Sequence, residues 1–203
     1  MKKAIFSFML LVLILGELKS QNSDKNNAIG LQIGLSRGGQ MMVGNIYDFL
    51  SSNPYTANNP PSINMSWDYA LGDRISVGGT FSFNKSSFEV GNSLTSGITP
   101  ATWKGTAYGV GARPLYHFLG KTSKKFDFYG GIGLHLLVWS YEYSPESSKN
   151  LYYSGLSQKA NFMFPITLGL RYYPSNKIGI SGEVGTNGIS LVNIGLSYRF
   201  DAL

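Results

Sequence analysis

From residue 28 onwards, the chain consists of stretches in which bulky apolar residues alternate with small or polar ones. A period of two is typical of β-strands whose two faces meet different surroundings. The clearest stretch is the last, whose apolar members are Val192, Ile194, Leu196, Tyr198 and Phe200. The pattern predicts eight strands, at about residues 28–36, 63–71, 75–83, 103–118, 126–138, 159–173, 178–185 and 192–200.

The two faces of these predicted strands differ in composition. One face is large and apolar, whereas the other is built mainly from Gly, Ser, Asn and a few charged residues. A strand of a soluble sandwich would instead turn Lys, Glu and Thr to the solvent. Apolar residues facing lipid and small or polar residues facing a narrow lumen are what a transmembrane β-barrel requires. We therefore predict an all-β fold, an eight-stranded antiparallel transmembrane up-and-down β-barrel, whose closure leaves no unpaired edge in hydrocarbon.

The predicted connections alternate in length. The short ones are residues 72–73, 120–125 and 174–176, and the long ones are residues 37–60, 85–101 and 142–158. Outer-membrane barrels have short periplasmic turns and longer extracellular loops, so the alternation predicts the orientation of the chain. The connection at residues 186–189 is an exception, because it is short and lies on the outer side.

Two features interrupt the pattern. Pro114 lacks the N–H that a central strand donates, so we expect a bulge or a local break there. Leu137 and Trp139 stand where inward polar residues are expected, so the fifth strand should either bulge or project above the membrane.

Two segments show a family resemblance. At LGLRYYPSNKIGISGEVG and the terminal NIGLSYRF, the chain resembles the small outer-membrane β-barrel proteins of Gram-negative bacteria, the porin-like family related to the membrane domain of outer-membrane protein A. Weaker similarity reaches back to residue 28. The resemblance implies outer-membrane lipid as the surroundings and the barrel-assembly machinery as a partner, with Phe200 ending the assembly signal.

The N-terminal segment differs from the rest of the chain. Residues 1–20 have two early lysines and an apolar run of about twelve residues, which is typical of a secretory signal peptide and too short for a spanning helix. Residues 21–27 form a polar tail, and residues 28–200 form the barrel domain. The chain has no cysteine, which excludes a disulfide framework and a lipid-modified N-terminal Cys.

The charge of the chain is low for its length. Charged residues make up 14% of the sequence, against about 25% in typical soluble domains. Without residues 1–20 the chain keeps 14 basic and 10 acidic residues, a net charge of +4. This balance is too mild to indicate a nucleic-acid partner.

Aromatic residues gather beside the predicted short turns. Such a girdle is typical of the periplasmic membrane interface of a barrel. Its predicted members are Tyr69, Tyr116, Phe118, Phe126, Phe128, Tyr172, Tyr198 and Phe200.

Alternation also predicts which charged residues face the lumen. The predicted lumen charges are Asp68, Arg113, Arg171, Glu183 and Arg199, and they share the lumen with His117 and His135. Isolated charges in a narrow lumen are costly, so we expect Glu183 and Asp68 to neutralise Arg113 and Arg171. A turn near Ser175 would place Arg171 opposite about Gly179, which makes Arg113 the better partner for Glu183.

The sequence offers little for catalysis. Both histidines face the lumen by alternation, no GxSxG motif is present, and no residues stand at metal-ligand spacing. We predict no enzymatic activity and no cofactor. The glycines of YGGIGLH alternate within a predicted strand without a following helix, so they indicate lumen spacing rather than nucleotide binding.

These observations predict a non-enzymatic integral outer-membrane protein. Its role would be envelope structure, adhesion or complex assembly through the extracellular loops, with a possible envelope protein partner. The alternative is a transporter of small solutes or hydrophobic compounds, through the lumen or a lateral opening. An eight-stranded barrel is about filled by its own side chains, which disfavours a diffusive pore.

Overall fold

The fold is described from a computed structural model. It covers residues 27–36, 55–90, 101–119, 123, 125–145, 156–175, 177–185, 187 and 189–200. The predicted signal peptide, and all of the predicted polar tail except Asn27, lie outside these residues. Within the described part, no helix has the length and apolar character needed to cross a membrane.

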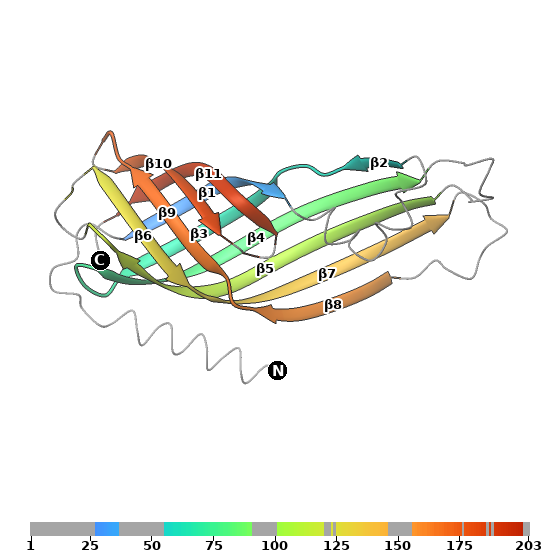
Figure 1. Ribbon diagram of the computed structural model, residues 1–203, viewed down its shortest axis with the longest axis horizontal. Coiled ribbons are helices and arrows are strands. Elements are labelled where there is room, and N and C mark those ends of the chain that lie inside the picture. Colours follow the sequence, from blue (N-terminus) through green and yellow to red (C-terminus); the bar gives the residue numbers. More distant parts are fainter. Residues whose placement is uncertain are drawn as a thin grey trace.

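Eleven strands make up the described structure (Figure 1). They are β1 (Ala28–Ser36), β2 (Tyr55–Asn58), β3 (Ser62–Ala70), β4 (Ile75–Val90), β5 (Ala101–His117), β6 (Phe126–Ile132), β7 (Leu134–Pro145), β8 (Leu156–Met163), β9 (Ile166–Tyr172), β10 (Ile178–Gly185) and β11 (Ser190–Arg199).

Two pairs of these strands are halves of one longer strand. β6 and β7 are separated by Gly133 and keep the same register against β5. β8 and β9 are separated at Pro165 and keep the same register against β7 and β6. Gly133 donates its N–H to the Pro165 carbonyl at 2.8 Å, but proline has no N–H to return the bond. β2 pairs only with the end of β4. The eleven elements therefore form eight long strands.

The eight long strands close into a ring. The order is β1, β3, β4, β5, β6 with β7, β8 with β9, β10 and β11, and β11 pairs with β1. All the pairings are antiparallel. The fold is a closed eight-stranded antiparallel β-barrel, so the predicted fold class is confirmed.

The barrel wall is uneven in height. β4, β5, β7 and β8 extend far beyond the other strands on one side (Figure 1). The prediction of loops at 85–101 and 142–158 is therefore wrong at their ends, since residues 85–90 pair with residues 101–106. β2 likewise lies within the predicted loop 37–60. The extensions carry Lys85, Lys104, Glu142 and Lys159 on their exposed faces, so no lipid-facing apolar row marks them as strands.

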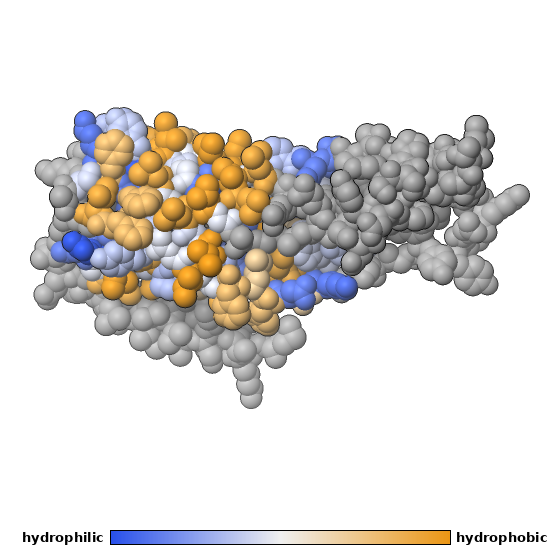
Figure 2. Space-filling view, viewed as in Figure 1, coloured by the Kyte–Doolittle hydropathy of each residue, from blue (hydrophilic) through white to orange (hydrophobic). Residues whose placement is uncertain are grey.

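The outer surface of the barrel is apolar. Exposed and buried residues alternate along most strands of the wall, as in β3, and the exposed ones include Ile33 (63% exposed) and Leu196 (61%). Figure 2 shows hydrophobic side chains covering most of the described wall on the face that it presents. The buried faces are mostly polar, which is the inverse of a soluble protein.

The expected irregularities take a different form. β5 runs without a break through Pro114, and the interruption falls in its neighbour at Gly133. Of the two alternatives expected at Leu137 and Trp139, the bulge is absent, because the register between β5 and β7 does not shift, whereas β7 does continue to Pro145 on the long side of the wall. Both side chains are buried in a cluster with Ala107 and Ile189.

Candidate functional site

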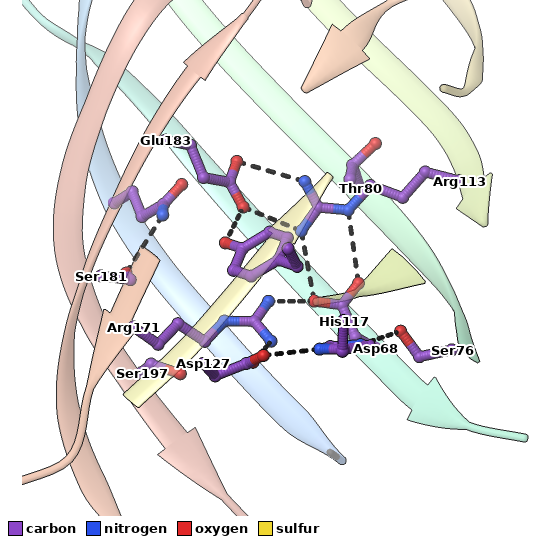
Figure 3. A network of polar contacts seen from close by, with 12 residues as sticks. Asp68, Ser76, Thr80, Arg113, His117, Asp127, Arg171, Ser181, Glu183 and Ser197 are labelled. Atoms are coloured by element: carbon purple, nitrogen blue, oxygen red, sulfur yellow. Dashed lines mark hydrogen bonds and ion pairs between the residues drawn. The ribbon is translucent and has the colours of Figure 1, made fainter. Parts of the chain in front are cut away.

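A network of charged side chains fills one part of the lumen (Figure 3). Its members come from five strands of the barrel. They are Asp68 of β3, Arg113 and His117 of β5, Asp127 and Tyr129 of β6, Arg171 of β9 and Glu183 of β10, and all are buried. Alternation places each of them on the inward face of its strand.

Glycines on neighbouring strands make room for these long side chains. In the strand pairing, Gly78 lies directly between Asp68 and Arg113. Gly169 lies in the same way between Tyr129 and Glu183. A Cβ atom added at Gly169 would overlap the ring of Tyr129. The Gly-rich inward faces are therefore spaces into which the neighbouring side chains fold.

Arg113 binds two carboxylates at once. Its Nη1 and Nη2 atoms donate to Oε2 and Oε1 of Glu183 at 3.1 and 3.0 Å. Its Nε and Nη2 atoms donate to Oδ1 and Oδ2 of Asp68 at 3.3 and 3.2 Å. Tyr129 donates its hydroxyl to Oε1 of Glu183 at 2.6 Å. Bidentate pairs of this kind combine charge with a fixed orientation.

Arg171 also binds the Asp68 carboxylate, from the other side of the lumen. Its Nη2 atom pairs with Asp68, its Nη1 atom donates to Asp127 at 3.3 Å, and its guanidinium lies 4.2 Å from the Tyr129 ring centroid. The expected register opposite Gly179 is wrong, because Arg171 lies opposite Ser181. Asp68 therefore connects the two arginines.

The network continues to a histidine. His117 Nδ1 lies 2.6 Å from Asp127 Oδ1, and His117 Nε2 lies 2.8 Å from the Ser76 hydroxyl. Asp127 and Tyr129 are not among the predicted network residues, although alternation with Phe126 and Phe128 places both on the lumen face. The signal was present, since Asp127 has the same inward position as the other lumen charges.

Arg199 is buried in the lumen at a different place from the pair of arginines. Its guanidinium lies 3.8 Å from the centroid of the Tyr173 ring, and the Tyr173 hydroxyl lies 2.8 Å from Ser197 Oγ. With neutral histidines, the buried charges of the described lumen are three arginines and three carboxylates. The lumen is thus formally neutral.

Beyond Arg113 and Glu183 the lumen is lined by uncharged polar groups. Asn64 donates to Asn193 Oδ1 at 2.9 Å, and Gln32 donates to Ser181 Oγ at 3.0 Å. The cavity among these residues has a volume of about 20 Å³, which is enough for about one water molecule. Among the described residues, no cluster of three or more His, Cys, Asp or Glu side chains is placed to hold a metal ion.

The aromatic residues predicted as a girdle lie at the barrel end with the short connections. Six of them are exposed by more than a third on the outer wall: Tyr116, Phe118, Phe126, Phe128, Tyr172 and Tyr198. Tyr69 and Phe200 are partly exposed. Several rings touch, with centroids 4.9 Å apart for Phe118 and Phe128 and 4.8 Å apart for Phe126 and Tyr172. Their place at a membrane interface stays a prediction.

Comparisons with known proteins agree with this architecture. Residues 63–191 match the family model described as Helicobacter outer membrane protein. The chain is similar in structure to the outer membrane protein OprG of Pseudomonas aeruginosa, with a TM-score of 0.51 and 12% identity, over 89% of this chain and 93% of that one. The comparison with curated proteins gives no match.

Two further solved structures are similar at lower scores. Ail of Yersinia pestis, in complex with the heparin analogue sucrose octasulfate, has 15% identity and a TM-score of 0.42, over 85% of this chain and 92% of that one. The N-terminal β-barrel domain of Pseudomonas aeruginosa OprF has 14% identity and a TM-score of 0.40, over 87% of this chain and 100% of that domain.

Proposed function

Because the chain belongs to the Helicobacter outer membrane protein family and is a β-barrel of the outer membrane, we propose that its role is non-enzymatic and non-conducting. The barrel holds its outer connections at the cell surface for adhesion, for assembly with an envelope protein partner, or for envelope structure. The observation that carries this proposal is the filled lumen, in which paired charges stand where a pore would run.

The charge network supports a lumen that stays closed. Opening a path past Arg113 would separate its guanidinium from Asp68 and Glu183, both of which are buried with it. Removing one partner of a buried ion pair typically costs about 3–5 kcal/mol, because the remaining charge is left without compensation. The cavity next to the network has a volume of about 20 Å³, which is room for about one water molecule.

Ser76, His117 and Asp127 are linked in the order found in serine hydrolases. A nucleophile must nevertheless reach its substrate, whereas Ser76 and His117 are 0% exposed. Asp127 is also shared with Arg171. These contacts favour a packing role for the three residues over a catalytic one.

Planar-bilayer recording tests the closed lumen. We expect the purified wild-type protein to give no reproducible channels above background. The variant R113A/E183A, which removes one arginine and one carboxylate together, should raise the leak of small ions. Reproducible channels from the wild-type protein would contradict the proposal and favour transport of small solutes.

The surface role has its own experiment. Replacing residues 91–100 by a Gly/Ser linker of the same length leaves the described strands β4 and β5 in place. We expect this variant to lose an envelope protein that co-purifies with the wild-type barrel from native membranes. The same partner retained by variants of each outer connection would contradict an assembly role.

A further inference from the structure

Positive charge is concentrated at one end of the barrel. The end with the short connections carries Arg74 between β3 and β4, Lys125 before β6 and Lys177 before β10, with Asp73 as the acidic residue of the same turns. The sequence also has Lys121 and Lys124 between β5 and β6. Counting Asp201, which follows β11 in the sequence, the residues in and beside these connections are five basic and two acidic.

The three described cations are held on the rigid part of the barrel. The carbonyl of Arg74 accepts from the N–H of His117 at 2.8 Å, that of Lys125 from Tyr173 at 2.8 Å, and that of Lys177 from Arg199 at 2.7 Å. Each bond ties a turn to a neighbouring strand, so the backbones of the cations are fixed. All three side chains are exposed. We call Arg74, Lys125 and Lys177 the basic belt.

Arg74 lies directly beside the aromatic residues of the outer wall. Its Nη1 atom donates to the Tyr116 hydroxyl at 3.0 Å, and the Tyr116 ring meets Phe118 edge to face at 5.4 Å. Exposed Tyr and Phe rings lie at the level of the headgroups in membrane proteins. With the girdle at the predicted interface, the guanidinium would lie at the height of the lipid phosphates, and its planar fork suits phosphate oxygens.

The opposite end of the described wall carries Lys85, Lys104 and Lys159, which are also exposed, and Lys104 lies opposite the exposed Glu142 in the pairing of β5 with β7. These lysines lie away from the predicted girdle, whereas the basic belt lies at the same end of the barrel as the girdle aromatics. The belt is thus distinguished by its place beside the girdle.

We propose that the basic belt binds the phosphate groups of anionic phospholipids in the leaflet next to the short connections. Arg74 with Tyr116 forms the best-defined contact, and Lys125 and Lys177 extend it around the barrel. Clustered Lys and Arg residues beside a spanning segment attract anionic lipids, and the attraction weakens with salt. The belt would favour one orientation and a ring of anionic lipids around the barrel.

Native mass spectrometry of the refolded full chain tests this inference. The protein would be released from mixed micelles that contain equal amounts of phosphatidylglycerol and phosphatidylcholine. We expect the wild-type protein to retain several-fold more phosphatidylglycerol than phosphatidylcholine, and the preference to fall as salt rises. The variant R74Q/K125Q/K177Q should lose the preference.

A matched control removes the same number of positive charges from the other end of the barrel. The variant K85Q/K104Q/K159Q removes three cations from the opposite end and should retain lipids like the wild type. Two single variants test the same site if the triple variant does not fold. R74Q removes the guanidinium, and Y116F removes only the hydroxyl that holds it. Each should lower the preference for phosphatidylglycerol in part.

Several outcomes would overturn the inference. They are equal retention of both lipids by the wild type, unchanged retention by R74Q/K125Q/K177Q, and equal loss by the control. Equal lipid retention by the wild type, together with binding to purified peptidoglycan that disappears in R74Q/K125Q/K177Q, would assign the belt to the cell wall instead. None of these results depends on conductance, so the closed lumen is tested separately.

Discussion

Glu183 occupies a central position among the buried side chains of the lumen. It accepts two hydrogen bonds from Arg113 and one from Tyr129, while only 7% of its surface is exposed. Its carboxylate and that of Asp68 together compensate the buried guanidinium. Because the arginine cannot lose its proton, its charge must be compensated within the lumen.

Replacing Glu183 by Gln should therefore destabilise the barrel. The amide keeps the size of the side chain but leaves Arg113 with Asp68 alone, which Arg171 also shares. We expect a loss of about 3 kcal/mol in the free energy of unfolding, measured by urea titration in detergent with tryptophan fluorescence. E142Q is the matched control, because Glu142 is exposed and should change stability by less than about 0.5 kcal/mol. Equal stability of E183Q and wild type would contradict a buried charge pair.

At the scale of the strands, the lumen depends on large residues lying opposite glycine. Tyr129 of β6 folds over Gly169 of β9, which also faces Glu183 of β10. The ring then supports Arg171, whose guanidinium lies 4.2 Å from its centroid. The contact between Tyr129 and Gly169 thus helps to hold Glu183, an acceptor of the network, and Arg171, a donor, in place.

Gly169→Ala tests this contact between strands. The added methyl group would overlap the Tyr129 ring and hydroxyl, so either the ring or the strand must move away from Glu183. We expect a loss of about 2 kcal/mol in unfolding free energy, measured in the same titration. G182A is the control, since a Cβ there would meet only the Asn193 carbonyl oxygen at 4.0 Å. Similar stabilities for the two variants would show that the space opposite Tyr129 is not limiting.

At the scale of the whole molecule, closure of the ring gives each of the eight long strands a paired neighbour on both sides, although the β8 half pairs with β7 alone. β11 returns to β1 over the register from Ala28 with Arg199 to Gly34 with Asn193. A closed ladder with an apolar exterior must separate cooperatively, because opening one seam exposes unpaired backbone groups along its length.

Closure predicts heat-modifiable migration on a gel. Without boiling, the folded barrel should stay compact in dodecyl sulfate and migrate faster than the boiled chain. The measurement compares unboiled and boiled samples of the wild type, and a urea-unfolded sample gives the position of the open chain. Identical migration of unboiled and urea-unfolded protein would count against a barrel that stays closed in detergent.

The sequence by itself determined which side of the wall each residue takes. A period of two assigns every residue of a strand to one face once a single residue is assigned. Asp68, Arg113, Arg171 and Glu183 were accordingly placed toward the lumen, and each is buried in the structure. The count of eight strands and the fold class followed from the same alternation, since each strand must carry one lipid-facing row.

Only the tertiary structure decided how the lumen arginines share their carboxylates. Asp68 reaches both arginines although these lie on strands far apart in sequence, and that contact depends on the stagger of the strands around the closed ring. Alternation says nothing of stagger, so Arg171 was assigned a wrong partner across β10. The buried cluster with Leu137 and Trp139 also required the ring, because an apolar residue on the inward face is explained only by what packs against it.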